Sequence, residues 1–81
     1  MKYIIAEINS CEVAILFPES IYHSIFKSLN PISAGFCRIV QKDSQNADPL
    51  IVEVWGKSKG LNLQHRKDDE EIIRHSIEFR A

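Results

Sequence analysis

The sequence predicts an α+β fold: a mostly antiparallel four-stranded sheet with two helices on one face, in the order β-β-α-β-β-α. Three observations lead to this prediction. Two runs of β-branched and aromatic residues near the start of the chain are separated by turn-forming residues, and a second pair of such runs follows in the middle. Two further segments have apolar residues at the spacing of amphipathic helices. Since 81 residues leave room for a single core, we treat 1–81 as one domain.

The first two strands are expected over Tyr3 to Ile8 and over Glu12 to Phe17. The residues between them, Asn9-Ser10-Cys11, begin with two that favour turns, so this part of the chain predicts a β-hairpin. Pro18 ends the second strand. It also suits the first turn of a helix, because the N–H that proline lacks has no partner there.

The first helix is therefore expected to begin at Pro18 and to end at Asn30-Pro31, because the residue before a proline avoids the α region. Its apolar residues recur at i, i+1, i+4, i+5 and i+8, with polar residues on the opposite side. The expected buried stripe consists of Ile21, Tyr22, Ile25, Phe26 and Leu29.

The second pair of strands is expected over Ile32 to Gln41 and Leu50 to Trp55, joined by a polar loop over 42–48 with Pro49 after it. Gly35 lies inside the first of these strands. Because glycine weakens a strand, this position predicts a bulge or the close approach of another backbone or ring.

The last helix is expected from near Arg66 to about Glu78, with three isoleucines, Ile72, Ile73 and Ile77, on its buried face. The acids of 68–71 stand in its first turns, where the helix dipole favours negative charge. They are interpreted as structural. The segment before this helix is rich in glycine, and its leucines, Leu61 and Leu63, are expected to fill the core.

Composition and charge exclude several classes of protein. The chain is 44% hydrophobic and 26% charged, which is typical of a folded domain, and its net charge of -1 creates no general attraction to nucleic acid or anionic lipid. Glu7 interrupts the apolar run that a signal peptide needs, and no apolar stretch is long enough to span a bilayer. Two cysteines are too few for a disulfide scaffold. These features predict a cytoplasmic protein without a membrane anchor.

The motifs that suggest catalysis or cofactor binding each lack an essential part. Trp55-Gly56-Lys57-Ser58 resembles the end of a phosphate-binding loop, but position 51 is isoleucine instead of glycine and no helix follows directly. The cysteines and histidines lack the short spacing of zinc sites, so the histidines are interpreted as surface residues and the cysteines as small hydrophobic ones. Neither a cofactor nor a metal nor a catalytic residue is predicted. A nucleophile at Cys37, paired with His23 or His75, is left open because the sequence does not show spatial proximity.

One charge asymmetry stands out. The segment from Val54 to Lys67 carries four cations and no acid, and its basic, glycine-containing loop lies beside Trp55. Such a loop suits phosphates or an acidic protein surface, with the indole ring stacking on a base or filling a pocket. The alternative is a solvated loop with the tryptophan half in the core. The candidate contact residues are Trp55, Lys57, Lys59, Arg66 and Lys67.

Two stretches of the chain resemble small uncharacterised proteins of bacteriophages and prophages. These are Ser33-Ala34-Gly35-Phe36 and the pattern Gly56-Lys57-Ser58-x-x-Leu61-x-Leu63-x-x-Arg66-x-x-Asp69-x-Glu71-Ile72-Ile73, in which a strand ends in a Gly-x-Ser turn and an acidic helix follows. The sequence departs from that pattern at Asn62, His65 and Lys67. Asparagine is the best substitute for glycine at a left-handed position, so the turn is retained.

The resemblance implies a phage or mobile-element origin and no known activity. Small phage proteins commonly bind a host complex and block it. We therefore expect a non-enzymatic protein-binding module in the bacterial cytoplasm, in the manner of an anti-CRISPR inhibitor of host defence, whose partner is a host protein complex. Exposed strand edges also favour a homodimer. The alternative expectation is a nucleic-acid-binding accessory protein that uses the basic loop 57–67.

Overall fold

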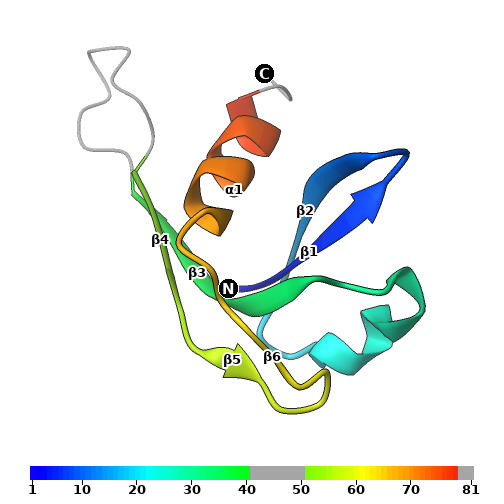
Figure 1. Ribbon diagram of the computed structural model, residues 1–81. Helices are drawn as coiled ribbons and strands as arrows, with labels where there is room; N and C mark the ends of the chain where they lie inside the picture. The colour runs from blue at the N-terminus through cyan, green and yellow to red at the C-terminus, as the bar shows by residue number, and fades with distance from the viewer. Residues whose placement is uncertain (41–50, 79–81) are drawn as a thin grey trace.

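A computed structural model describes residues 1–40 and 51–78. Its main sheet has four antiparallel strands in the spatial order β2-β1-β3-β4, so the predicted α+β class and four-stranded sheet are confirmed (Figure 1). The strands are β1 (Lys2–Ile8), β2 (Cys11–Phe17), β3 (Ser33–Val40) and β4 (Ile51–Trp55). The predicted polar loop over 42–48 and Pro49 lie outside the described residues.

The predicted hairpin of β1 and β2 is present, with a turn of two residues. Asn9 and Ser10 both have left-handed backbone conformations, with φ of 54° and 66°. This is the arrangement of a type I′ turn, whose twist matches that of the flanking strands. Ile8 therefore pairs directly with Cys11, which belongs to β2 instead of the turn.

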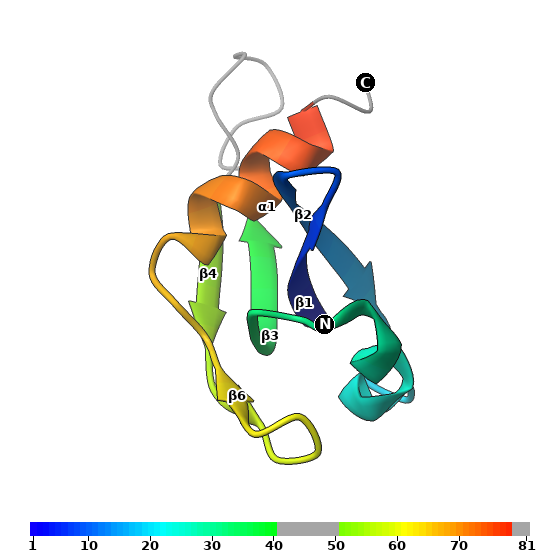
Figure 2. The ribbon, with the colours of Figure 1, turned by 45° about the vertical axis from the view of Figure 1, so that its right-hand side comes forward.

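One face of the sheet, which we call the helix face, is covered by the helix α1 (Asp69–Glu78) (Figure 2). Because side chains alternate along a strand, Tyr3 and Ile5 of β1 point to this face. Ile73 of α1 is fully buried against them, as predicted, and the half-buried side chains of Ile72 and Ile77 complete the contact. The acids of the first turn of α1 stand where the sequence predicts them.

The second face of the sheet is formed by the intervening residues, among them Ile4 and Ala34, which are buried with Phe17. Phe26 of the helix η1 (His23–Leu29) packs here. The two helices therefore contact opposite faces, and this corrects the expectation that both lie on one face. The cause is local: Phe17, the last residue of β2, points to the second face, and the chain that follows it folds back on that side.

The helix η1 also differs from the expected α-helix, because it is a 3₁₀ helix of seven residues. With three residues per turn, positions three apart share one side. His23 and Phe26 are thus turned inward, while Tyr22 and Ile25, which an α-helical stripe would bury, are 74% and 64% exposed. The helix ends as predicted at Asn30, whose φ is 52°.

A second, two-stranded sheet follows β4 and was not predicted. It pairs β5 (Lys57–Ser58) with β6 (Leu63–Gln64). Between these strands the chain turns through Asn62, with φ of 55°, as expected of a substitute for glycine. Leu61 and Leu63 are half-buried against the cluster of the second face, so their predicted role in the core is confirmed.

Gly35 lies where β3 meets the end of β4. A Cβ atom at this position would stand 2.6 Å from the carbonyl oxygen of Trp55 and 3.2 Å from the Cβ of His65. The predicted close approach of another backbone is therefore confirmed. Because Gly35 has no side chain, the segment after β6 can pass across the end of the sheet toward α1.

Candidate binding surface

The five predicted contact residues lie in two places. Trp55 ends β4, and Lys57 and Lys59 belong to β5 and the turn after it. Arg66 and Lys67, in contrast, stand directly before α1, where the chain has passed to the helix face. The five residues belong to one continuous segment of the sequence, but in the structure they lie on two separate parts of the surface.

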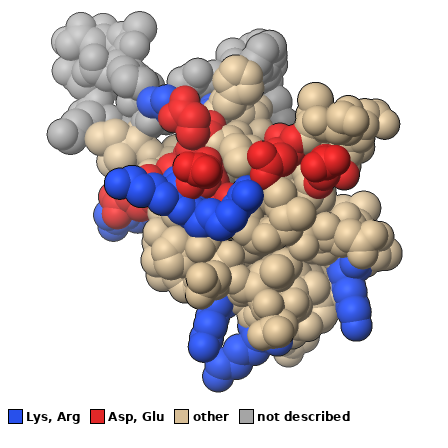
Figure 3. Space-filling view, viewed as in Figure 1, with Lys and Arg blue, Asp and Glu red and all other residues tan. Residues whose placement is uncertain are grey.

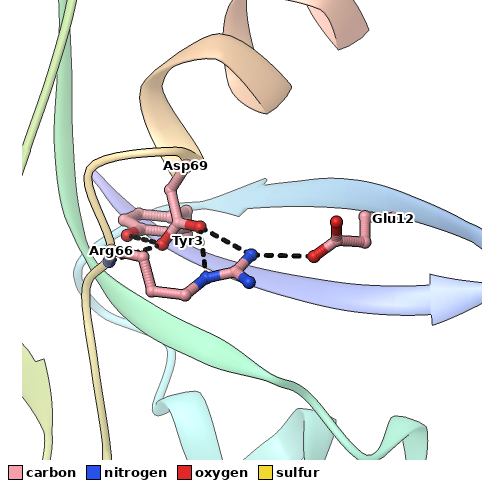
Figure 4. A network of polar contacts seen from close by, with 4 residues as sticks. All are labelled: Tyr3, Glu12, Arg66 and Asp69. Atoms are coloured by element: carbon pink, nitrogen blue, oxygen red, sulfur yellow. Dashed lines mark hydrogen bonds and ion pairs between the residues drawn. The ribbon is translucent and has the colours of Figure 1, made fainter.

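Arg66 is held by two acids (Figure 4). Its Nε donates a hydrogen bond to Oδ1 of Asp69 at 3.0 Å, and its Nη2 donates to Oε1 of Glu12 at 2.9 Å. Because Glu12 belongs to β2 and Asp69 to α1, the guanidinium ties the helix to the edge of the sheet. Arg66 therefore has a structural role that the sequence did not reveal, and it is less available to a partner than a lysine without an ion pair.

Asp69 is fully buried and accepts hydrogen bonds from two further groups. The backbone N–H of Arg66 donates to Oδ2 at 2.9 Å, which ties the segment before α1 to the first residue of the helix. The hydroxyl of Tyr3, from the centre of the sheet, donates to the same oxygen at 2.5 Å. Burial raises the pKa of the Tyr3 phenol far above its usual range, and the bond to Asp69 adds to this effect, so the hydroxyl stays a donor.

On the second face, Lys57 and Lys59 border a hollow of about 390 Å³. Its lining comes from four separate parts of the chain: the start of β1, the entry to η1, the middle of β3, and the turn after β5. The lining residues are Lys2, Tyr22, His23, Ser24, Phe36, Lys57, Ser58, Lys59 and Gly60. Three of these are lysines, and none is an acid.

The rings that wall this hollow are held in place by their neighbours. Nε2 of His23 lies 2.9 Å from the carbonyl oxygen of Gly35, so it carries the proton and donates. The His23 ring is 7% exposed and meets the Phe36 ring edge to face, at 5.8 Å between centroids and 86° between planes. The expectation that the histidines lie on the surface is therefore wrong for His23.

Trp55 and Tyr22 extend the ring surface outward. The Trp55 ring stacks on Phe36, with 6.3 Å between centroids and 18° between planes, and Trp55 is 45% exposed. On the other side, Nζ of Lys2 donates to the carbonyl oxygen of Ile21 at 2.9 Å and lies 5.5 Å from the centroid of the Tyr22 ring. A cation over an aromatic face stabilises both in this position.

On the face of the molecule that Figure 3 shows, the acids lie in one half, whereas cations lie in both. In Figure 3 the lower end, where Figure 1 shows β5, carries only blue side chains, whereas the red ones gather in the upper half. Within the described part of the chain, no ion pair involves Lys57 or Lys59. Their charges thus face solvent and are available to a partner. We call Lys2, Tyr22, Phe36, Trp55, Lys57 and Lys59 together the basic-aromatic surface.

Sequence reasoning missed three members of this surface: Lys2, Tyr22 and Phe36. Tyr22 was assigned to the buried stripe of an α-helix, and Lys2 and Phe36 lie in strands that carry no local sign of a site. The signal that could have found Lys2 and Phe36 is the sheet register, which places Lys2 opposite Phe36 and Phe36 opposite Trp55. That register depends on long-range pairing.

The structure does not bring Cys37 and His23 together. Cys37 is 1% exposed on the helix face, whereas His23 lies on the second face, so these two form no pair. Burial raises the pKa of the Cys37 thiol, which disfavours the reactive thiolate. Both cysteines are free. Among residues 1–40 and 51–78 no three His, Cys, Asp or Glu side chains are grouped as metal ligands would be.

No helix in the described ranges is both long and apolar enough to cross a membrane. Comparisons with protein-family models, with curated proteins and with solved structures found no match to this chain. The resemblance to phage and prophage proteins stays a prediction.

Proposed function

We propose that the protein is a non-catalytic binding module that captures an acidic surface of a partner protein on its basic-aromatic surface. The observation that carries the proposal is the hollow beside Lys57 and Lys59, whose walls are aromatic and whose lining, as far as the structure describes the chain, holds no acid. As its biological setting we propose phage or mobile-element origin and inhibition of a host defence complex in the bacterial cytoplasm.

The exposed rings favour a protein partner. Interfaces between proteins are enriched in aromatic side chains, and a few such residues supply most of the binding energy. Tyr22 and Trp55 are 74% and 45% exposed, so each offers apolar area that a partner would bury. The lysines would steer an acidic partner and select its orientation.

Nucleic acid is the second candidate, because the stacked rings of Phe36 and Trp55 beside two lysines also suit an unpaired base and its phosphate. The basic area is short, however: within the described lining, three lysines border the hollow. An extended chain of phosphates would find few cations there. This favours a compact acidic group on a protein over an extended polyanion.

The test is a charge reversal, Lys57→Glu with Lys59→Glu, in a tagged protein used to capture partners from a nuclease-treated lysate of a bacterial host. We expect wild-type protein to retain a specific protein that the double variant loses. The control is Lys27→Glu, at an exposed lysine of η1 that does not line the hollow. The proposal fails if the double variant captures the same protein. The nucleic-acid candidate gains if wild-type protein captures that protein only from a parallel lysate without nuclease treatment.

A homodimer stays a prediction beside this proposal. Within the described sheet, β2 and β4 are the outer strands. Sedimentation velocity on the purified protein measures the oligomeric state directly.

A further inference from the structure

We infer that the partner inserts one aromatic side chain, flanked by carboxylates, into the hollow beside Tyr22 and Phe36. This inference rests on the proposed function, since it names the chemical nature of the partner segment at the same surface. The volume, the walls and the charge of the hollow each support it.

The volume fits a side chain of this class. At about 390 Å³ the hollow is at the small end of the range of ligand pockets, roughly 300–1,000 Å³. The part of its lining that is exposed to solvent is mostly apolar, although lysines surround it. An ion alone would leave these apolar walls exposed to water, whereas an aromatic ring would bury them.

The walls are set before a partner arrives. The His23 ring is fixed by its bond to the carbonyl oxygen of Gly35, and it holds the edge of Phe36. Gly56, with φ of 79°, passes so close to Phe36 that a Cβ there would stand 2.8 Å from the ring. Because this side of the hollow is already ordered, an incoming side chain loses little free energy to rearrangement of the protein.

The lysines that line the hollow favour a partner segment with acidic side chains. Lys57 and Lys59 line the hollow from β5 and the turn after it, and Lys2 lines it from the start of β1, with its ammonium over the Tyr22 ring. Cations from two separate parts of the chain around an aromatic hollow are complementary to an aromatic residue flanked by carboxylates. A segment with cations at these places would be rejected by the same charges.

The experiment uses two synthetic peptides, one with a single phenylalanine between two pairs of aspartates and one with alanine in its place. Each is titrated into ¹⁵N-labelled protein, and amide shifts are followed by NMR. We expect the phenylalanine peptide to shift amides at Tyr22, His23, Phe36 and 57–60. We expect the alanine peptide to bind about tenfold more weakly, which is the size of effect that loss of an aromatic anchor causes.

Two variants and a third probe complete the test. Tyr22→Ala, at a residue that is 74% exposed, should weaken binding of the phenylalanine peptide several-fold. Lys27→Glu should leave the binding of this peptide unchanged. The inference is overturned if both peptides bind equally, if the shifts lie away from the hollow, or if single-stranded oligothymidylate binds more tightly than the phenylalanine peptide.

These results are independent of the capture experiment. If the reversal of Lys57 and Lys59 abolishes capture while the two peptides bind equally, the proposed function stands and the aromatic anchor is refuted. If capture survives the reversal, the proposed function itself is refuted.

Discussion

At the scale of single residues, Asp69 is the centre of the polar network that joins α1 to the sheet. It is fully buried and accepts from Tyr3 and from both the backbone and the side chain of Arg66. We expect Asp69→Asn to lower the free energy of unfolding by about 2 kcal/mol, because the amide cannot accept all of these bonds and the guanidinium of Arg66 keeps only Glu12 as a counter-charge. Urea unfolding followed by circular dichroism measures this change.

The neighbouring Asp68 provides the control for this prediction. It is exposed, carries the same carboxyl group and stands one position earlier. Asp68→Asn should change stability by no more than about 0.5 kcal/mol. Equal effects of the two substitutions would mean that the buried network contributes nothing.

Tyr3 gives the network a dependence on pH. The folded protein keeps the phenol proton to a higher pH than the unfolded chain does, because the pKa of Tyr3 is raised by burial and by Asp69. The contribution of Tyr3 is thus complete below the unfolded pKa of about 10 and is lost as pH rises above it, with a slope of about 1.4 kcal/mol per pH unit. Unfolding free energies at pH 9, 10 and 11 should fall less steeply in Tyr3→Phe than in wild type. Parallel slopes would contradict this.

The sequence shows only part of this residue-scale chemistry. An acid in the first turn of a helix is visible in the sequence, and the structural interpretation of 68–71 agrees with the position of Asp69. Its partner Tyr3 lies 66 positions earlier. Nothing local to either residue indicates that they meet, and for the same reason Arg66 resembled a free cation.

At the scale of elements, the crossing at the end of the sheet depends on Gly35. A Cβ there would stand 2.6 Å from a backbone oxygen, which no side-chain adjustment relieves. We expect Gly35→Ala to destabilise the fold by about 2 kcal/mol or more through overpacking. Gly60→Ala is the matched control, because its Cβ would meet only Ser24 at an ordinary 3.4 Å. The prediction is tested by comparing the thermal unfolding of the two variants. A Gly35→Ala protein as stable as Gly60→Ala would refute the steric argument.

The elements were predictable to different degrees for physical reasons. Strands and the hairpin turn follow from local preferences, so β1, β2 and the turn at Asn9 were found. The helix η1 was assigned the wrong period, because a run of seven residues does not separate a 3₁₀ from an α pattern, and tertiary contacts of His23 and Phe26 decide between them. The short pair β5 and β6 has too few residues to show any alternation.

At the scale of the whole molecule, the candidate surface is assembled from distant segments, and a continuous run of sequence is a poor guide to it. The basic run ending at Lys67 predicted one site, but the fold sends its second half to the helix face. What replaces that half is Lys2 with Tyr22 and Phe36. The sequence therefore predicted the part near Trp55 and could not predict the rest without the register of the sheet.

The compactness of this surface limits its interaction with nucleic acid. Among residues 1–40 and 51–78, three lysines border the hollow, so about three phosphates are neutralised there. The logarithm of the affinity for single-stranded oligothymidylate should then fall with the logarithm of salt concentration with a slope no steeper than about -2. Trp55 is the only tryptophan of the chain and stacks at the edge of the surface, so quenching of its fluorescence reports binding. A steeper slope would show that phosphates contact cations elsewhere.

The bond between Tyr3 and Asp69 has a consequence for the time course of folding. It joins β1 to α1 across 66 positions, so it closes a long loop of chain, and we expect it to form late in folding. A contact made after the rate-limiting step slows unfolding and leaves refolding unchanged. Loss of the Asp69 carboxylate is therefore expected to speed unfolding more than it slows refolding.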